Sequence, residues 1–230
     1  MSEKFNDLFL KHGAAAYDKQ LYLQAQFGKA GWAFDLNSGV LAFRRPHEDP
    51  LQLSVQVLGT ESEETKTWLW AWANDSAVPP TLMASALQLK QLGESQGIEE
   101  FASPELPITP EVNPARISLV ASGILRASAW FCAPYPRGAA WLLIKDPKYK
   151  RSVTKPIQRI AKAFPLFLSK HFVSDQRATF LHYLKFYRLD VVEQGNDIIA
   201  SAKAVAGALA LGQQQLVAEF DTRNRLVSLK

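Results

Sequence analysis

The fold of this chain is decided by the stretch LQLSVQVLGT, residues 51–60. From Leu51 to Val57, apolar residues at the odd positions alternate with polar residues at the even ones, which is the period of a half-buried β-strand. An acidic turn follows, and after it comes the aromatic segment TWLWAWAN, residues 67–74. We therefore predict that the two segments pair as antiparallel strands.

Signals before this strand predict a helix and then a hairpin. Apolar residues recur at helical spacing over residues 3–27, and Gly28 follows as a stop. Two apolar runs then flank Asn37-Ser38-Gly39, a sequence typical of a β-hairpin turn. The chain is therefore expected to enter its central strand from an antiparallel hairpin.

Signals after the strand predict helices, one more strand and two more hairpins. Pro79-Pro80 and Gly97 bracket a helix, and the apolar run over residues 115–130 predicts a buried helix. Other predicted elements are a strand over 139–145, a helix starting near 155 that is broken or bent at Pro165, a helix capped by Ser174 or Asp175, and hairpins turning at 195–196 and near 222–224. The segment 204–211 receives no assignment.

These elements predict an α+β fold in which antiparallel β-hairpins pack against helices. We expect two similar-sized α+β blocks. The first, residues 1–147, contains the Trp-rich strand, and the second, residues 152–230, contains two helices and two C-terminal hairpins. One compact domain containing both blocks is the alternative.

Length and composition fit a globular chain. Its 230 residues are 47% hydrophobic and 21% charged, and no apolar run is long enough to cross a bilayer. The N-terminus lacks the basic start and apolar core of a secretory signal, so we expect a cytoplasmic protein. The single cysteine, Cys132, excludes an intramolecular disulfide and cannot form a zinc site alone.

Charge is distributed unevenly along the chain. Residues 1–111 carry a net charge of −7 and residues 112–230 one of +11, with lysine and arginine densest over 145–170. Such a basic stretch suits the phosphate groups of nucleic acid or an anionic membrane surface, or it balances the acidic half of the chain. The candidate anion-binding residues are Lys155, Arg159 and Lys162.

The aromatic strand provides a candidate ligand-binding surface. Side chains alternate between the faces of a strand, so Trp68, Trp70 and Trp72 are expected to stand in one row. Indoles are broad apolar plates with a polar N–H, and they stack on sugars, bases or peptides. The same residues also suit a core beneath crossing helices, so an open groove and a core are both retained.

Glu61 is the candidate polar residue beside this row. It lies in the acidic turn with Glu63 and Glu64, where a carboxylate can act as a base, bind hydroxyl groups or simply be solvated. The four histidines are not spaced as metal ligands, and the sequence has no nucleophile elbow, phosphate-binding loop or dinucleotide-binding motif. We therefore predict no metal ion and no cofactor, and we name no catalytic residue.

Five motifs of the sequence occur together in one known family: VLGTE (57–61), TWLWAWAN (67–74), PEL (104–106), ISLVASGIL (117–125) and APY (133–135). The chain resembles an uncharacterised family of bacterial domains of unknown function, and the resemblance covers most of its length. It implies a cytoplasmic bacterial protein with no assigned activity, and it assigns no catalytic residue.

Three functions compete on this sequence. The first is a non-catalytic binding or interaction module for a protein or a small molecule, which uses the Trp face or the basic helix. The second is a small-molecule hydrolase with Glu61 acting beside the Trp row. The third is non-specific nucleic-acid binding through Lys145–Lys170, which is the least favoured because the features of a nucleic-acid module are missing.

Overall fold

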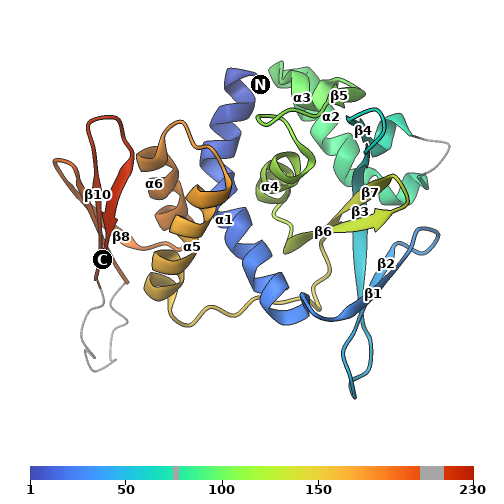
Figure 1. Ribbon diagram of the computed structural model, residues 1–230, viewed down its shortest axis with the longest axis horizontal. Coiled ribbons are helices and arrows are strands. Elements are labelled where there is room, and N and C mark those ends of the chain that lie inside the picture. The colour runs from blue at the N-terminus through green and yellow to red at the C-terminus, as the bar shows by residue number, and fades with distance from the viewer. Residues whose placement is uncertain (75–77, 203–214) are drawn as a thin grey trace. The chain divides into compact units, whose positions relative to one another are not determined.

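The computed structural model describes residues 1–74, 78–202 and 215–230 (Figure 1). The described residues form helices and antiparallel sheets joined by loops, which confirms the predicted α+β fold. The unassigned segment 204–211 lies outside the described residues. The α-helices are α1 (Glu3–Phe27), α2 (Ala84–Gln96), α3 (Glu99–Ala102), α4 (Pro114–Ile124), α5 (Pro156–Lys170) and α6 (Gln176–Phe186), and the 3₁₀ turns are η1 (Ala71–Ala73) and η2 (Pro80–Leu82).

The described strands form two antiparallel sheets. In the seven-stranded sheet the order is β1-β2-β3-β4-β5, with β7 also paired to β3 and β6 paired to β7. In the four-stranded sheet the order is β11-β10-β9-β8. The strands are β1 (Gly31–Asp35), β2 (Val40–Arg44), β3 (Leu51–Ser62), β4 (Thr67–Trp70), β5 (Glu105–Pro107), β6 (Ala129–Tyr135), β7 (Gly138–Ile144), β8 (Asp190–Gln194), β9 (Asp197–Ser201), β10 (Gln215–Phe220) and β11 (Leu226–Leu229).

The chain forms two compact units. The first contains residues 1–9 and 19–151, and the second contains residues 10–18 and 152–230. The boundary drawn from the sequence gives all of α1 to the first block, whereas the structure assigns the middle of this helix to the second unit. We call them unit 1 and unit 2.

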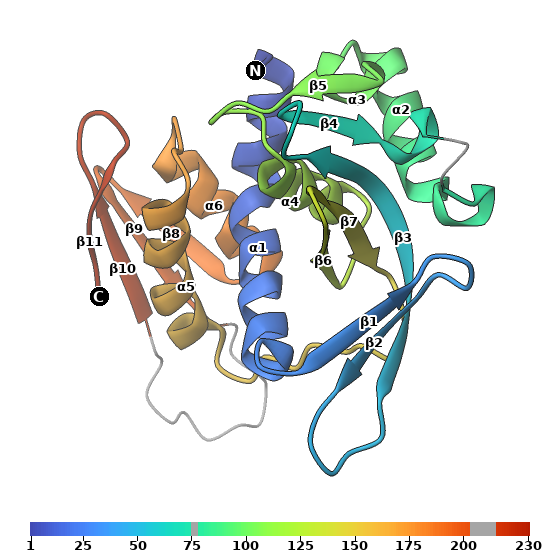
Figure 2. The same ribbon diagram turned by 45° about the vertical axis from the view of Figure 1, so that its right-hand side comes forward.

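Strand β3 is the centre of unit 1, as its alternating sequence predicts. Its first half pairs with β2, and its second half pairs with β4 on one side and β7 on the other. Figure 2 shows β3 bent into an arc, with the β1–β2 hairpin on one half and β7 on the other. The bend brings together the two ends of the strand series β1-β2-β3-β7-β6. The rings of Trp32 on β1 and Phe131 on β6 lie 5.2 Å apart, centre to centre.

A β-bulge interrupts β3 in the middle. The register with β7 shifts between Val57 and Gly59, so the strict alternation of the sequence does not continue through it. Val57 and Thr60 therefore face the same side of the sheet, while Gly59 and Glu61 face the other side with their partners Trp70 and Trp68.

The prediction of a row of three indoles on one strand is wrong. Strand β4 ends at Trp70, and the chain continues into η1, so Trp72 leaves the strand. Trp68 and Trp70 have no exposed surface and meet edge to face at 5.3 Å. The indole N–H of Trp70 donates a hydrogen bond of 3.0 Å to the backbone oxygen of Glu100. These two indoles are core, the second of the two readings that the sequence allowed.

The buried helix predicted over residues 115–130 is shorter than expected. Helix α4 ends at Ile124, and Arg126 adopts a positive φ of 53° that closes the helix. Trp130 belongs to strand β6 instead. The apolar run continues across this break because β6 packs into the same core as α4, so hydrophobicity alone does not mark the end of the helix.

Unit 2 packs α5 and α6 against one face of the four-stranded sheet (Figure 1). Phe180 of α6 contacts Phe164 of α5 at 4.8 Å and Phe220 of β10 at 5.8 Å. Alternate residues of β9 and β10 are buried beneath these helices, as expected for a sheet covered on one face. Both hairpins predicted for this part of the chain are present.

Candidate functional site

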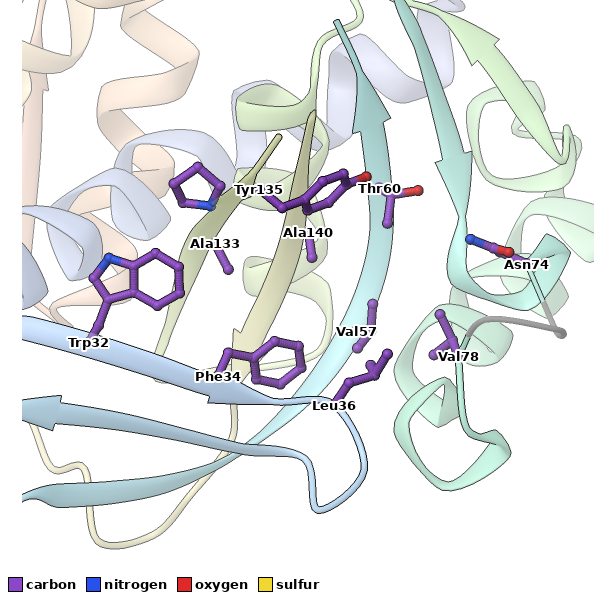
Figure 3. A pocket seen from close by; sticks show the side chains of 11 residues that line it. Trp32, Phe34, Leu36, Val57, Thr60, Asn74, Val78, Ala133, Tyr135 and Ala140 are labelled. Carbon is purple, nitrogen blue, oxygen red and sulfur yellow. The ribbon is translucent and has the colours of Figure 1, made fainter. Parts of the chain in front are cut away.

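A cleft of about 490 Å³ opens on the inner face of the curved sheet of unit 1 (Figure 3). It lies between the two ends of the strand series, so β1 forms one wall and β6 with β7 forms the other. Ligand sites often occupy such mouths of curved or closed sheets. The lining residues are Trp32, Phe34, Leu36, Val57, Thr60, Asn74, Val78, Ala133, Pro134, Tyr135 and Ala140.

Strand alternation places the aromatic wall of the cleft. Trp32 and Phe34 are two residues apart on β1, so their rings share one face of the strand. Figure 3 shows both rings directed toward the strands opposite. Trp32 keeps 39% of its surface exposed and Leu36 keeps 36%. Large apolar side chains held open to solvent in one place are characteristic of a binding surface.

Small residues form the floor of the cleft. Ala133 on β6 and Ala140 on β7 are directly paired across the two strands. Their methyl groups fill little space, so the sheet surface between the aromatic walls stays hollow. A larger residue at Ala140 would therefore occupy the cleft.

A glycine determines where the ring of Tyr135 lies. Tyr135 is paired with Gly138 across the β6–β7 turn. A Cβ on Gly138 would lie 2.3 Å from the backbone oxygen of Glu61 and 3.0 Å from the Tyr135 ring. Because that Cβ is missing, the ring lies over the neighbouring strand at the rim of the cleft, where 46% of the Tyr135 surface is exposed.

Three uncharged polar groups reach the cleft from different elements. The bulge in β3 turns Thr60 into it, Asn74 follows η1, and Tyr135 ends β6. Figure 3 shows the hydroxyl ends of Thr60 and Tyr135 close to each other, on the opposite side from Trp32. The cleft thus has an apolar end and a polar edge.

The described lining of the cleft is apolar, with a few uncharged polar groups. None of the described lining residues carries a carboxylate, an amine, an imidazole or a thiol. No cluster of metal-ligating side chains occurs within residues 1–74, 78–202 and 215–230. The hydroxyl groups of Thr60 and Tyr135 are the lining groups of the kinds that act in nucleophilic or acid–base catalysis.

Glu61 faces away from this cleft. The bulge turns it to the helix-covered side of the sheet, opposite Trp68 of β4 and Ala139 of β7. Partial burial raises the pKa of its carboxyl group, and the N–H of Trp141 acts in the opposite direction. The structure thus places Glu61 beside buried Trp68 but in none of the three cavities described here.

The three predicted indoles do not form the site either. Trp68 and Trp70 lie in the core on the helix-covered side of the sheet, so no ligand reaches them. Trp72 lies in η1, where the ammonium group of Lys90 is 4.5 Å from its ring centre. The aromatic residues that do line an open surface are Trp32 and Phe34 on the first hairpin.

Cys132 lies beside a second, smaller cavity of about 280 Å³, which is also lined by Trp130 and Trp141. Burial raises the pKa of its thiol to about 11, and the negative charge of Glu61 adds to the effect. The thiol is therefore protonated at neutral pH and is a poor nucleophile.

Of the three predicted anion-binding residues of unit 2, Arg159 forms an ion pair within the fold. The guanidinium of Arg159 is bound to Asp18, whose carboxylate has no exposed surface, and it also donates to the Asp18 backbone oxygen at 2.9 Å. Lys155, the N-cap residue of α5, and Lys162, on α5, are exposed. Arg159 is thus held in a structural contact, with its side chain partly exposed.

Another depression of unit 2, of about 710 Å³, is lined by α6 and β8. Its polar side chains include His182, Lys185, Arg188 and Glu193. Burial lowers the pKa of His182, and the positive charges of Lys11 and Lys185 lower it further. Glu193 forms an ion pair with Arg177 at 2.6 Å.

Comparison with known proteins identifies the first part of the chain. The sequence profile of a family of unknown function, DUF6882, matches residues 6–147, which is more than half of the chain. The chain belongs to DUF6882. This confirms the resemblance to an uncharacterised family that the sequence motifs indicated. No curated protein and no solved structure shows significant similarity to the chain.

The DUF6882 segment contains every residue that lines the aromatic cleft. The candidate anion-binding residues at 155, 159 and 162 lie outside it. None of the helices in the described part of the chain has the length and apolar character that a membrane span requires. The cleft therefore lies wholly within the part of this chain that belongs to DUF6882.

The sequence carried one signal for this cleft. The segment GWAFD, residues 31–35, places two large aromatic residues on one face of a strand at the edge of a hairpin. The floor at Ala133 and Ala140 carries no such signal, because alanine is common in any buried strand. The approach of β1 to β6 depends on the curvature of the sheet, which the sequence does not specify locally.

Proposed function

We propose that unit 1 is a non-catalytic module that binds a small molecule in the aromatic cleft. The observation that carries this proposal is the combination of exposed aromatic walls with an alanine floor in one cleft of about 490 Å³. Ligand pockets in proteins commonly measure roughly 300–1,000 Å³ and are lined mainly by apolar side chains with a few polar groups.

Covering the exposed apolar surface of the cleft favours the binding of a ligand. Trp32, Leu36 and Tyr135 keep large apolar surfaces in contact with water. Covering apolar surface contributes about 25 cal/mol for each Å². A molecule that lies between the walls gains this contribution on both of its faces.

The two alternatives have weaker support. A hydrolase that uses Glu61 needs this carboxylate in a cleft, and Glu61 lies on the other face of the sheet. Nucleic-acid binding through α5 needs its basic side chains free, and Arg159 is paired with Asp18. A bacterial source and a cytoplasmic location stay predictions from the sequence.

Filling the cleft tests the proposal. Nile red is uncharged and fluoresces more strongly in apolar surroundings, so we expect its emission to rise when it is added to the protein. The variant Ala140→Phe places a ring on the floor of the cleft and is expected to remove most of this rise.

A matched variant supplies the control. Ala33→Phe adds the same ring to the exposed opposite face of β1, outside the cleft, and is expected to leave the emission unchanged. Circular dichroism of both variants checks that they fold. Equal Nile red emission from folded Ala140→Phe and the unaltered protein would overturn the proposal.

A further inference from the structure

The described residues at the polar edge of the cleft carry uncharged polar groups. Thr60 supplies a hydroxyl, Asn74 an amide and Tyr135 a phenol, and they come from three separate elements of unit 1. A hydroxyl and an amide each donate and accept hydrogen bonds. The inference below rests on the proposed function of the cleft and concerns which ligand it takes.

These groups are not used up by the fold. Among the described residues, the side chains of Thr60 and Asn74 have no hydrogen-bond partner. The hydroxyl of Tyr135 donates to the backbone oxygen of Glu61 at 3.4 Å, which is at the long limit of a hydrogen bond. Within the described part of the chain, the Thr60 and Asn74 side chains thus keep their hydrogen-bonding capacity for a ligand, and the Tyr135 hydroxyl can still accept.

Among the described residues that line the cleft, no charged side chain is present to compensate a charge on the ligand. The described lining residues include no lysine, arginine, aspartate or glutamate. Taking an ion from water into apolar surroundings is costly unless an opposite charge or several hydrogen bonds compensate it. A charged ligand is therefore disfavoured relative to a neutral one of the same shape.

We propose that the cleft selects an uncharged molecule with a flat apolar body and one polar end. The body lies between the β1 wall, with Trp32 and Phe34, and the floor at Ala140. The polar end, a hydroxyl or a neutral amide, points to Thr60, Asn74 and Tyr135. Aromatic side chains favour flat partners because stacked rings gain contact over their whole area.

Three probes with the same ring system test this selectivity by isothermal titration calorimetry on the whole chain. Naphthalene has no polar end, 2-naphthol has a neutral hydroxyl, and 2-naphthoate has a charged carboxylate. A net hydrogen bond is worth about three- to tenfold in affinity. We expect 2-naphthol to bind at least threefold more tightly than naphthalene, and 2-naphthoate to bind more weakly than both.

Variants of the polar edge link this order to particular groups. The double variant Thr60→Val with Tyr135→Phe keeps the shape of the cleft and removes two hydroxyls. It is expected to reduce 2-naphthol to the affinity of naphthalene while the affinity of naphthalene stays the same. Thr81→Val, at an exposed position outside the cleft, is the matched control and is expected to change neither.

The outcomes separate this inference from the proposed function. Equal binding of naphthalene and 2-naphthol, both lost in Ala140→Phe, overturns the inference and keeps the cleft as the binding site. Tighter binding of 2-naphthoate than of 2-naphthol also overturns the inference. Binding of the probes that persists in folded Ala140→Phe, or no binding of any probe, overturns both proposals.

Discussion

At the scale of single residues, the environment of Cys132 decides its chemistry. Its position within the aromatic stretch FCAPYP favours an inert, small apolar residue, because a catalytic thiol needs a nearby histidine that the sequence does not show. In the structure the thiol is partly buried near Glu61, and both burial and the negative charge favour its protonated form. The ordinary pKa of an exposed thiol is lower, about 9.0.

This environment predicts slow alkylation of Cys132. We expect iodoacetamide to modify the folded protein at about pH 8 much more slowly than the same chain unfolded in urea. The rate should rise steeply only as the pH approaches the thiol pKa of about 11. Mass spectrometry of timed samples measures the rate, and equally fast modification of the folded and unfolded chains at pH 8 would contradict the prediction.

The same pKa shift has a consequence for stability. Between pH 9.0 and about 11 the unfolded thiol loses its proton while the folded one retains it. The folded state binds more protons over this range, so the contribution of Cys132 to the free energy of unfolding falls as the pH rises. A Cys132→Ser variant should lack this contribution in urea titrations across the same range.

At the scale of secondary-structure elements, one buried carboxylate connects three helices of unit 2. Asp18, from the segment of α1 that belongs to this unit, has no exposed surface. It accepts hydrogen bonds from the guanidinium of Arg159 on α5 and from the hydroxyl of Tyr187 at the end of α6. Tyr17 packs beside it against Phe167 of α5 at 5.7 Å.

Removing this charge is expected to destabilise the protein. Asp18→Asn leaves the guanidinium of Arg159 without its counter-charge, and breaking a buried ion pair costs roughly 3–5 kcal/mol. Because the Arg159 side chain is still 25% exposed, we expect a smaller loss, about 2–3 kcal/mol in the free energy of unfolding. Urea denaturation followed by circular dichroism measures it.

An exposed ion pair provides the comparison. Glu48 contacts Arg45 at 2.6 Å, with 50% and 40% of the two side chains exposed. Surface pairs contribute about 0–1 kcal/mol, so Glu48→Gln should leave the denaturation midpoint nearly unchanged. Similar losses for Asp18→Asn and Glu48→Gln would show that the buried pair has no special role.

At the scale of the whole molecule, each compact unit contains two separate segments of the chain. Unit 2 includes residues 10–18 as well as 152–230. The boundary drawn from the sequence leaves residues 10–18 in the first block. That boundary would separate Asp18 and Tyr17 from their partners on α5 and α6.

A fragment cut at that boundary is therefore expected to fold poorly. Residues 152–230 alone lack Asp18, so the guanidinium of Arg159 and the hydroxyl of Tyr187 lose the hydrogen bonds that Asp18 accepts. We expect weak helical circular dichroism and non-cooperative thermal unfolding, both improved by adding a synthetic peptide of residues 1–27. The same peptide with Asp18→Asn should be less effective, and cooperative unfolding of the fragment without any peptide would contradict the prediction.

The sequence predicted most of the elements correctly because their signals are local. The alternating run from Leu51 to Val57 predicted β3, and helical spacing with a following Gly28 predicted α1 to its last residue. The turn at Asn37-Ser38-Gly39 likewise predicted the β1–β2 hairpin, since turn residues and side-chain periods depend only on neighbouring positions. Local signals failed where two elements share one apolar run, as at the end of α4.

Only the tertiary structure decided which residues form the candidate site. A bulge between Val57 and Gly59 exchanges the faces of β3, so that Thr60 enters the cleft and Glu61 turns to the helices. Strand β4 stops after Trp70, and the chain continues into η1, which takes Trp72 off the strand. The curvature of the sheet brings β1 to β6 and makes the two walls of the cleft.

Each of these features depends on pairing between distant segments, and a one-residue change of register reverses every side chain on a strand. The sequence by itself therefore determined the elements of this protein, and long-range strand pairing decided the faces they present.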